Sequence, residues 1–118
     1  MSALRDAALA FVASHETMDA AVWHDDFPDR FPELSARLRA VAEVLRAAAD
    51  ADPSNSLAAP ARDAADARLA MPTEEYVSAE VFHRGVELTA DEAAAVRAIR
   101  SVLRGPVVLE MIDGGRTS

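Results

Sequence analysis

The chain has 118 residues, no cysteine, no lysine, 27 alanines and a formal net charge of −8. This length indicates a single domain, 1–118, that can bury its own core, and the missing cysteine excludes disulfides, thiolate metal sites and a cysteine nucleophile. The negative charge disfavours nucleic acid, and every apolar run is far shorter than the ~20 residues of a membrane span. Because the N-terminal stretch also lacks the organisation of a signal peptide, we expect a cytoplasmic protein without a membrane anchor.

A first helix is predicted over about residues 3–22. Apolar residues recur there at steps of three and four, which is the spacing of one helix face. The apolar stripe is formed by Leu4, Ala8, Phe11, Met18 and Val22, and His15 lies within it.

The stretch DDFPDRFPE, residues 25–33, predicts a turn after this helix, because proline disfavours helix in the residue before it. Phe27 and Phe31 are expected to fill the corner. A second helix should begin near Pro32 and end near residues 49–52. The matching apolar stripes and the short turn predict an antiparallel helical hairpin.

Turn-forming residues dominate 51–58, which is a possible hinge within the domain. A third helix over about 61–71 would present a face made mostly of alanine and would pack by close approach. The segment 73–85 carries the end signals of a helix, whereas residues 76–83 also alternate like a strand. We favour the helix there.

A further helix is predicted over about 89–104, with Thr89 and Glu92 spaced as a capping box and a stop at Gly105. After it, 107–112 is short, apolar and β-branched, which predicts a strand in need of a partner, and 113–118 should be a flexible tail. The predicted fold class is mainly α with a short C-terminal strand. The alternative is α+β, with a small sheet from 76–83 and 107–112.

His15, Glu16 and Asp19 have the form of a zinc-protease helix motif in which the second histidine is replaced. Such metal sites need two histidines one turn apart and a third ligand. Because His15 lies in the apolar stripe, we favour a histidine at the edge of the core, bonded to a neighbouring carboxylate or carbonyl. We expect no metal and no cofactor; a metal site at these three residues is the alternative.

Six acids and one arginine lie between Ser14 and Glu33. This acidic corner could attract a basic partner or could simply aid solubility. The candidate interaction surface consists of Trp23, Asp25, Asp26, Phe27 and Phe31 at the corner, and of Val107, Val108, Leu109, Met111 and Ile112 near the C-terminus.

Arg97, Arg100 and Arg104 lie on one face of the last predicted helix, where they could contact phosphates or pair with acids. Neither a phosphate-binding glycine loop nor a nucleophile motif is present. We therefore favour a non-enzymatic, regulatory protein that binds a protein partner or itself as a homo-oligomer. The alternatives are a metal-binding protein or metal-dependent enzyme using His15 and Asp19, and a DNA-associated regulator.

Overall fold

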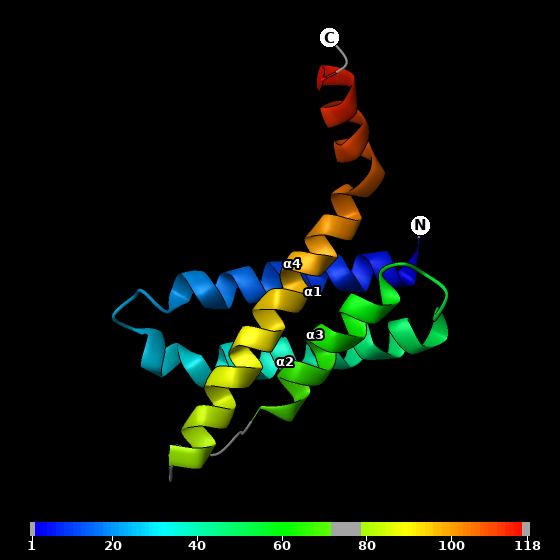
Figure 1. Ribbon diagram of the computed structural model, residues 1–118. Coiled ribbons are helices and arrows are strands. Elements are labelled where there is room, and N and C mark those ends of the chain that lie inside the picture. The colour runs from blue at the N-terminus through cyan, green and yellow to red at the C-terminus, as the bar shows by residue number, and fades with distance from the viewer. Residues whose placement is uncertain (1, 72–78, 117–118) are drawn as a thin grey trace.

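The computed structural model describes residues 2–71 and 79–116, with the side chains of these residues except those of Phe82 and 105–116. Four helices account for most of this chain: α1 (Ala3–Ala21), α2 (Phe27–Ala51), α3 (Ala58–Ala70) and α4 (Ala79–Arg116). Figure 1 shows α1 and α2 as one antiparallel pair, crossed obliquely by the antiparallel pair of α3 and α4. The predictions of a mainly α fold and of an N-terminal helical hairpin are confirmed.

Helix α1 follows its predicted bounds closely. Ser2 is its N-cap, and the Ser2 hydroxyl accepts a hydrogen bond from the backbone N–H of Arg5 at 3.2 Å. This bond satisfies one of the N–H groups that the first turn leaves without a partner. Leu4 and Phe11 from the predicted stripe are buried against the other helices, while Val22 lies past the helix end and is exposed.

Helix α2 begins at Phe27, earlier than the expected start near Pro32. Pro28 occupies the first turn, where the missing N–H of proline costs no helical hydrogen bond. Pro32 lies one turn further into the helix, where proline removes a single backbone bond. The buried face is continuous from there on and consists of Leu34, Leu38, Ala42, Leu45 and Ala49.

The connection between α2 and α3, within the predicted hinge at 51–58, is held by side-chain hydrogen bonds. Asn55 donates from Nδ2 to Asp52 at 3.0 Å, and Asn55 Oδ1 accepts from the N–H of Leu57 at 2.9 Å. Leu57 itself is buried in the core. These contacts set the direction in which α3 leaves α2.

Helix α3 is the predicted alanine-faced helix. Its buried residues are Ala58, Ala61, Ala64, Ala65, Ala67 and Arg68. Two ion pairs join its outer side to α2, Arg62 to Asp50 at 2.7 Å and Arg46 to Asp66 at 3.3 Å. At its C-terminus, Arg39 of α2 donates to the carbonyls of Arg68 and Met71, where the helix ends and its last carbonyls lack i+4 partners. Small side chains and bonds to α2 therefore hold α3 close to its neighbours.

Helix α4 corrects several expectations about the C-terminal half. Residues 79–85 are its first turns rather than the end of a separate helix, and the helix passes through Gly85. Thr89 is an interior residue whose hydroxyl donates to the Gly85 carbonyl at 2.8 Å, so Thr89 and Glu92 do not form a capping box. A glycine inside a helix costs about 1 kcal/mol, less than the roughly 1.5–3 kcal/mol gained by burying a side chain such as Leu88.

The predicted C-terminal strand at 107–112 is wrong, because α4 continues through Gly105 and Pro106 to Arg116. A helix satisfies its backbone N–H and C=O groups internally, whereas a lone strand leaves them without partners. β-Branched residues such as valine cost only a few tenths of a kcal/mol in a helix. The described part of the alternative sheet, 79–83 and 107–112, is also helical, whereas 76–78 lie outside the described residues.

The first six residues of the predicted helix over 73–85 also lie outside the part of the chain that the structure describes. Residues 113–116 of the predicted flexible tail belong to α4, and residues 117–118 lie outside the described part of the chain.

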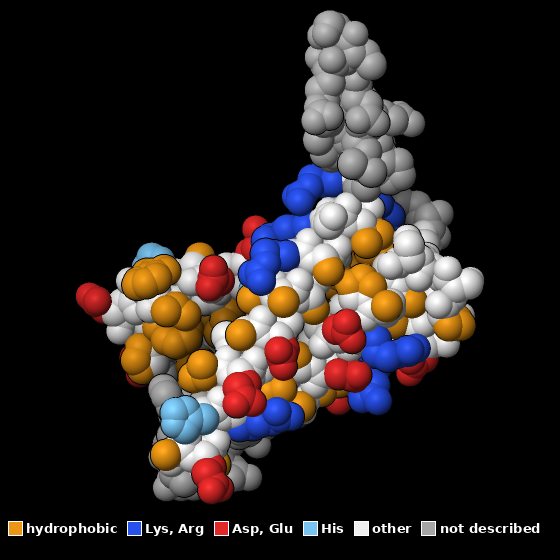
Figure 2. All heavy atoms as spheres, in the orientation of Figure 1, with side chains coloured by type: hydrophobic (Ala, Val, Ile, Leu, Met, Phe, Trp, Pro, Cys, Tyr) orange, Lys and Arg blue, Asp and Glu red, His pale blue; other side chains and the backbone are white. Residues whose placement is uncertain are grey.

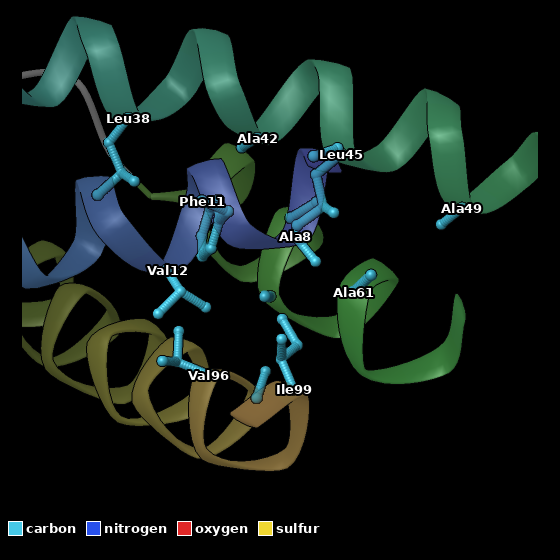
Figure 3. Close-up of a cluster of buried hydrophobic side chains, with 14 of the residues drawn as sticks. Ala8, Phe11, Val12, Leu38, Ala42, Leu45, Ala49, Ala61, Val96 and Ile99 are labelled. Atoms are coloured by element: carbon cyan, nitrogen blue, oxygen red, sulfur yellow. The ribbon is translucent and has the colours of Figure 1, made fainter. Parts of the chain in front are cut away.

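The core lies where all four helices meet. Figure 3 shows Phe11 of α1, Leu45 of α2, Ala61 of α3 and Ile99 of α4 pointing into one cluster. All four of these side chains are fully buried. One continuous set of buried residues thus includes every helix.

Candidate functional site

His15 lies at the edge of the core, one turn after Phe11 on α1. Its side chain is 17% exposed, and its Nδ1 lies 2.6 Å from Oε1 of Glu92 on α4. The structure thus pairs the histidine with a carboxylate, the arrangement that its place in the apolar stripe favoured. This contact links the first helix of the chain to the last.

Glu92 is completely buried and also binds Arg68 of α3. The Arg68 Nε donates to one carboxylate oxygen, and Nη2 donates to the other at 2.8 Å. A two-pronged arginine–carboxylate pair compensates the loss of water around both charges. His15, Arg68 and Glu92, here called the polar cluster, therefore connect α1, α3 and α4 inside the core.

The pKa of Glu92 reflects two opposing effects. Burial raises the pKa, because a low-dielectric interior disfavours the charged carboxylate. The hydrogen bonds from His15 and Arg68 and the charge of the guanidinium lower it, and the resulting pKa lies below the ordinary value of 4.5. The folded protein therefore holds Glu92 in its ionised form at neutral pH.

This lowered pKa predicts how the polar cluster responds to acid. A carboxyl group with a lower pKa in the folded state stabilises the fold above its unfolded pKa, and this stabilisation is lost as the pH falls through the folded pKa. We therefore expect the wild type to be more stable than Glu92→Gln near neutrality, and the difference in unfolding free energy to shrink once the pH falls below 4.5.

Urea unfolding of both proteins from about pH 7 to about pH 3 measures this difference, because other carboxyl groups titrate alike in the pair. Glu33→Gln is the control, since the Glu33 side chain is 73% exposed and bonds only Arg37 in the described structure. Its difference from the wild type should stay near zero throughout. A Glu92→Gln difference that is unchanged in acid contradicts the prediction.

The three residues of the candidate metal motif do not converge. His15 faces Glu92, Glu16 pairs with Arg100 of α4 at 3.3 Å, and Asp19 is exposed. Within the described residues, no group of three or more histidine, aspartate or glutamate side chains has an arrangement that could hold a metal ion. What the motif contributes to the structure is contact between α1 and α4.

Arg68 and Glu92 were not recognised from the sequence as members of one cluster. The signal is present, however, because Glu92 lies one turn before Val96 and two turns before Ile99, on the same buried face. Arg68 likewise follows Ala64 and Ala61 on the buried face of α3. Opposite charges on two apolar stripes predict a buried pair, since an unpaired charge there would be too costly.

The α1–α2 corner comprises Val22, Trp23, Asp25, Asp26, Phe27, Asp29 and Phe31. Phe27 packs partly against the core, and its ring meets that of Phe31 edge to face, with centroids 5.7 Å apart. Trp23 is 85% exposed, and Val22 and Phe31 are also exposed. Figure 2 shows hydrophobic side chains gathered at this end of the molecule, with acidic side chains close by.

The corner also explains why two aspartates follow α1. Helix α1 ends at Ala21, so Asp25 and Asp26 lie past it, and Asp26 is the N-cap residue of α2. Negative charge is favourable at the start of a helix. Asp25, Asp26 and Asp29 are exposed and form no ion pair with any residue that the structure describes. Their charge therefore stands beside the exposed Trp23.

The arginines of α4 differ in their surroundings. Arg100 is occupied by the ion pair with Glu16, whereas Arg97 and Arg104 are exposed. Within the described residues, no helix has a stretch that is both long and apolar enough to cross a membrane.

Comparisons of this chain with protein-family models, curated proteins and solved structures give no match.

Proposed function

We propose that this protein is a non-enzymatic interaction module that binds a basic partner protein through the α1–α2 corner. The observation that carries the proposal is Trp23, a large aromatic side chain that is 85% exposed, more than any other large hydrophobic side chain in the described part of the chain. Tryptophan is among the residues that contribute most to protein–protein binding, because it buries a large area with few rotatable bonds.

The charge around Trp23 supports a basic partner. Three exposed aspartates of the corner form no ion pair in the described structure, and Arg30 is the one arginine between Ser14 and Glu33, so the corner attracts arginine and lysine and repels acidic surfaces. The fold supplies rigidity: Phe27 anchors the corner to the core while Phe31 extends the apolar surface. Self-association through 107–112, now as the last turns of α4, is the second candidate. Figure 1 shows these turns extending away from the other helices.

The test uses tagged wild type and tagged Trp23→Ala to capture binding proteins from an extract of the source cells. An untagged copy of this protein is added to the extract, so that self-association is detected as well. We expect Trp23→Ala to weaken capture of the partner about thirtyfold or more, the effect of losing a central tryptophan. The same substitution should change the unfolding free energy by less than about 0.5 kcal/mol, because the side chain is exposed. Titration of the captured partner, followed by Trp23 fluorescence, confirms direct contact.

Val44→Ala is the matched control, because Val44 is a 61% exposed side chain on α2 outside the corner. It should capture the partner as the wild type does. Equal capture by wild type and Trp23→Ala contradicts the proposal for the corner. Capture of the untagged copy that survives Trp23→Ala but is lost from a chain ending at Gly105 would favour the second candidate instead.

A further inference from the structure

One stretch of α4 is basic although the protein as a whole is acidic. Residues 93–104 contain three arginines and no acid, whereas the whole chain has a net charge of −8. Arg100 pairs with Glu16 of α1. Arg97 and Arg104 are exposed, lie two turns apart on one side of the helix, and form no ion pair within the described residues. These two arginines therefore present positive charge that no described part of the same molecule neutralises.

The side chains beside these two arginines are short and leave the helix surface open. We call this surface the arginine face and define it as five exposed residues of α4: Ala94, Arg97, Ala98, Ser101 and Arg104. A guanidinium group pairs with carboxylates and also stacks on aromatic rings, most favourably on indole. The arginine face is therefore suited to a surface that combines a tryptophan with acidic side chains.

The α1–α2 corner of the same protein is such a surface. Trp23 is 85% exposed there, and the exposed Asp25, Asp26 and Asp29 form no ion pair within the described part of the chain. Figure 2 shows the hydrophobic and acidic side chains of the corner and arginine side chains along the upper part of α4 on one face of the molecule. Two copies related by a twofold axis can therefore make the same contact twice, each with its corner on the other's α4.

We propose that the α1–α2 corner of one copy binds the arginine face of a second copy. Trp23 lies against the short side chains of the face, and the aspartates of the corner pair with Arg97 and Arg104. This inference rests on the proposed function of the corner and names a partner whose contact surface is basic. Each copy has a net charge of −8, but physiological salt screens that repulsion beyond about 8 Å, whereas the opposite charges of the contact meet within this range.

Sedimentation equilibrium of the purified full-length protein measures the dissociation constant of the dimer. Arg97→Asp/Arg104→Asp makes the arginine face acidic. Asp25→Arg/Asp29→Arg makes the corner basic. Each variant alone brings like charges together, so we expect each to dimerise at least about tenfold more weakly than the wild type. An equimolar mixture of the two variants restores opposite charges at both contacts and should associate with nearly the affinity of the wild type.

Arg46→Asp/Arg84→Asp is the matched control, because it reverses two exposed arginines outside both surfaces and changes the net charge as much as the arginine-face variant does. It should dimerise as the wild type does. The inference is overturned if the purified wild type is a monomer at every concentration, if either surface variant dimerises like the wild type, if the control is equally weakened, or if the mixture associates no better than the variants alone.

Failure of this inference can be told apart from failure of the proposed function. A monomeric wild type that still captures another protein through Trp23 overturns the second copy as partner and leaves the proposed function of the corner standing. If the proposed function itself fails, Trp23→Ala changes neither the capture of proteins from the extract nor the association of the purified protein.

Discussion

Replacement of Arg68 by methionine is expected to lower the free energy of unfolding by about 3–5 kcal/mol, the cost of leaving one partner of a buried ion pair without the other. Arg68 is the main counterion of Glu92, which has no exposed surface. After the substitution, only His15 remains to bond this carboxylate. Chemical unfolding monitored by circular dichroism at neutral pH measures the loss.

Arg62→Met supplies the control on the same helix. Arg62 pairs with Asp50 at 2.7 Å, but both side chains are roughly half exposed, and such pairs contribute about 0–1 kcal/mol. The double variant Arg68→Met/Glu92→Leu should recover much of the loss, because apolar side chains can replace a buried pair at little cost. If Arg68→Met and Arg62→Met are equally stable, the polar cluster does not stabilise the fold in the way described.

Phe11→Ala is expected to destabilise the protein by about 3–5 kcal/mol, since it removes a buried aromatic ring and leaves a cavity. Phe11 has no exposed surface, and Figure 3 shows it among side chains of all four helices. The loss is a large part of the 5–15 kcal/mol that typically stabilises a domain. Thermal and urea unfolding should therefore show a lower midpoint with the same cooperative transition.

Leu9→Ala is the control for this substitution, because Leu9 lies on the same helix with 44% of its surface exposed. It should cost much less than Phe11→Ala. Where Phe11→Ala prevents folding altogether, Phe11→Leu keeps the effect measurable by removing fewer contacts. A Phe11→Ala protein as stable as Leu9→Ala would show that this ring does not fill the core.

The N-terminal half of the fold could be predicted because its signals are local and agree with one another. The stripe from Leu4 to Met18 has a helical period, and the two Phe-Pro pairs mark the turn to the next helix. The short connection then leaves an antiparallel hairpin as the natural arrangement. Even here the start of α2 was misplaced, because Pro28 fits the first turn of a helix as well as a turn outside it.

The C-terminal half could not be predicted so well, because its local signals are those of helix ends and of a strand. Gly85 and Gly105 are typical helix ends, yet α4 passes through both. The burial of Leu88, Val96 and Ile99 along one face favours a helix that continues past Gly85, and beyond Gly105 a helix satisfies its own backbone groups where a lone strand would not. For the candidate site, Trp23 was proposed as a contact residue from the sequence, whereas its exposure depends on how α1 and α2 are joined. Residues far apart in the chain, such as Arg68 and Glu92, meet only in the folded structure.

The alanine face of α3 also limits how this sequence can vary over time. Ala61, Ala64 and Ala65 have no exposed surface, and any longer side chain there would push α3 away from α2 and α4. Glycine would fit but would weaken the helix, and serine would bring a hydroxyl that needs a bonding partner. Acceptable exchanges at these positions are therefore few, and tolerated substitutions should concentrate on the outward side of the same helix.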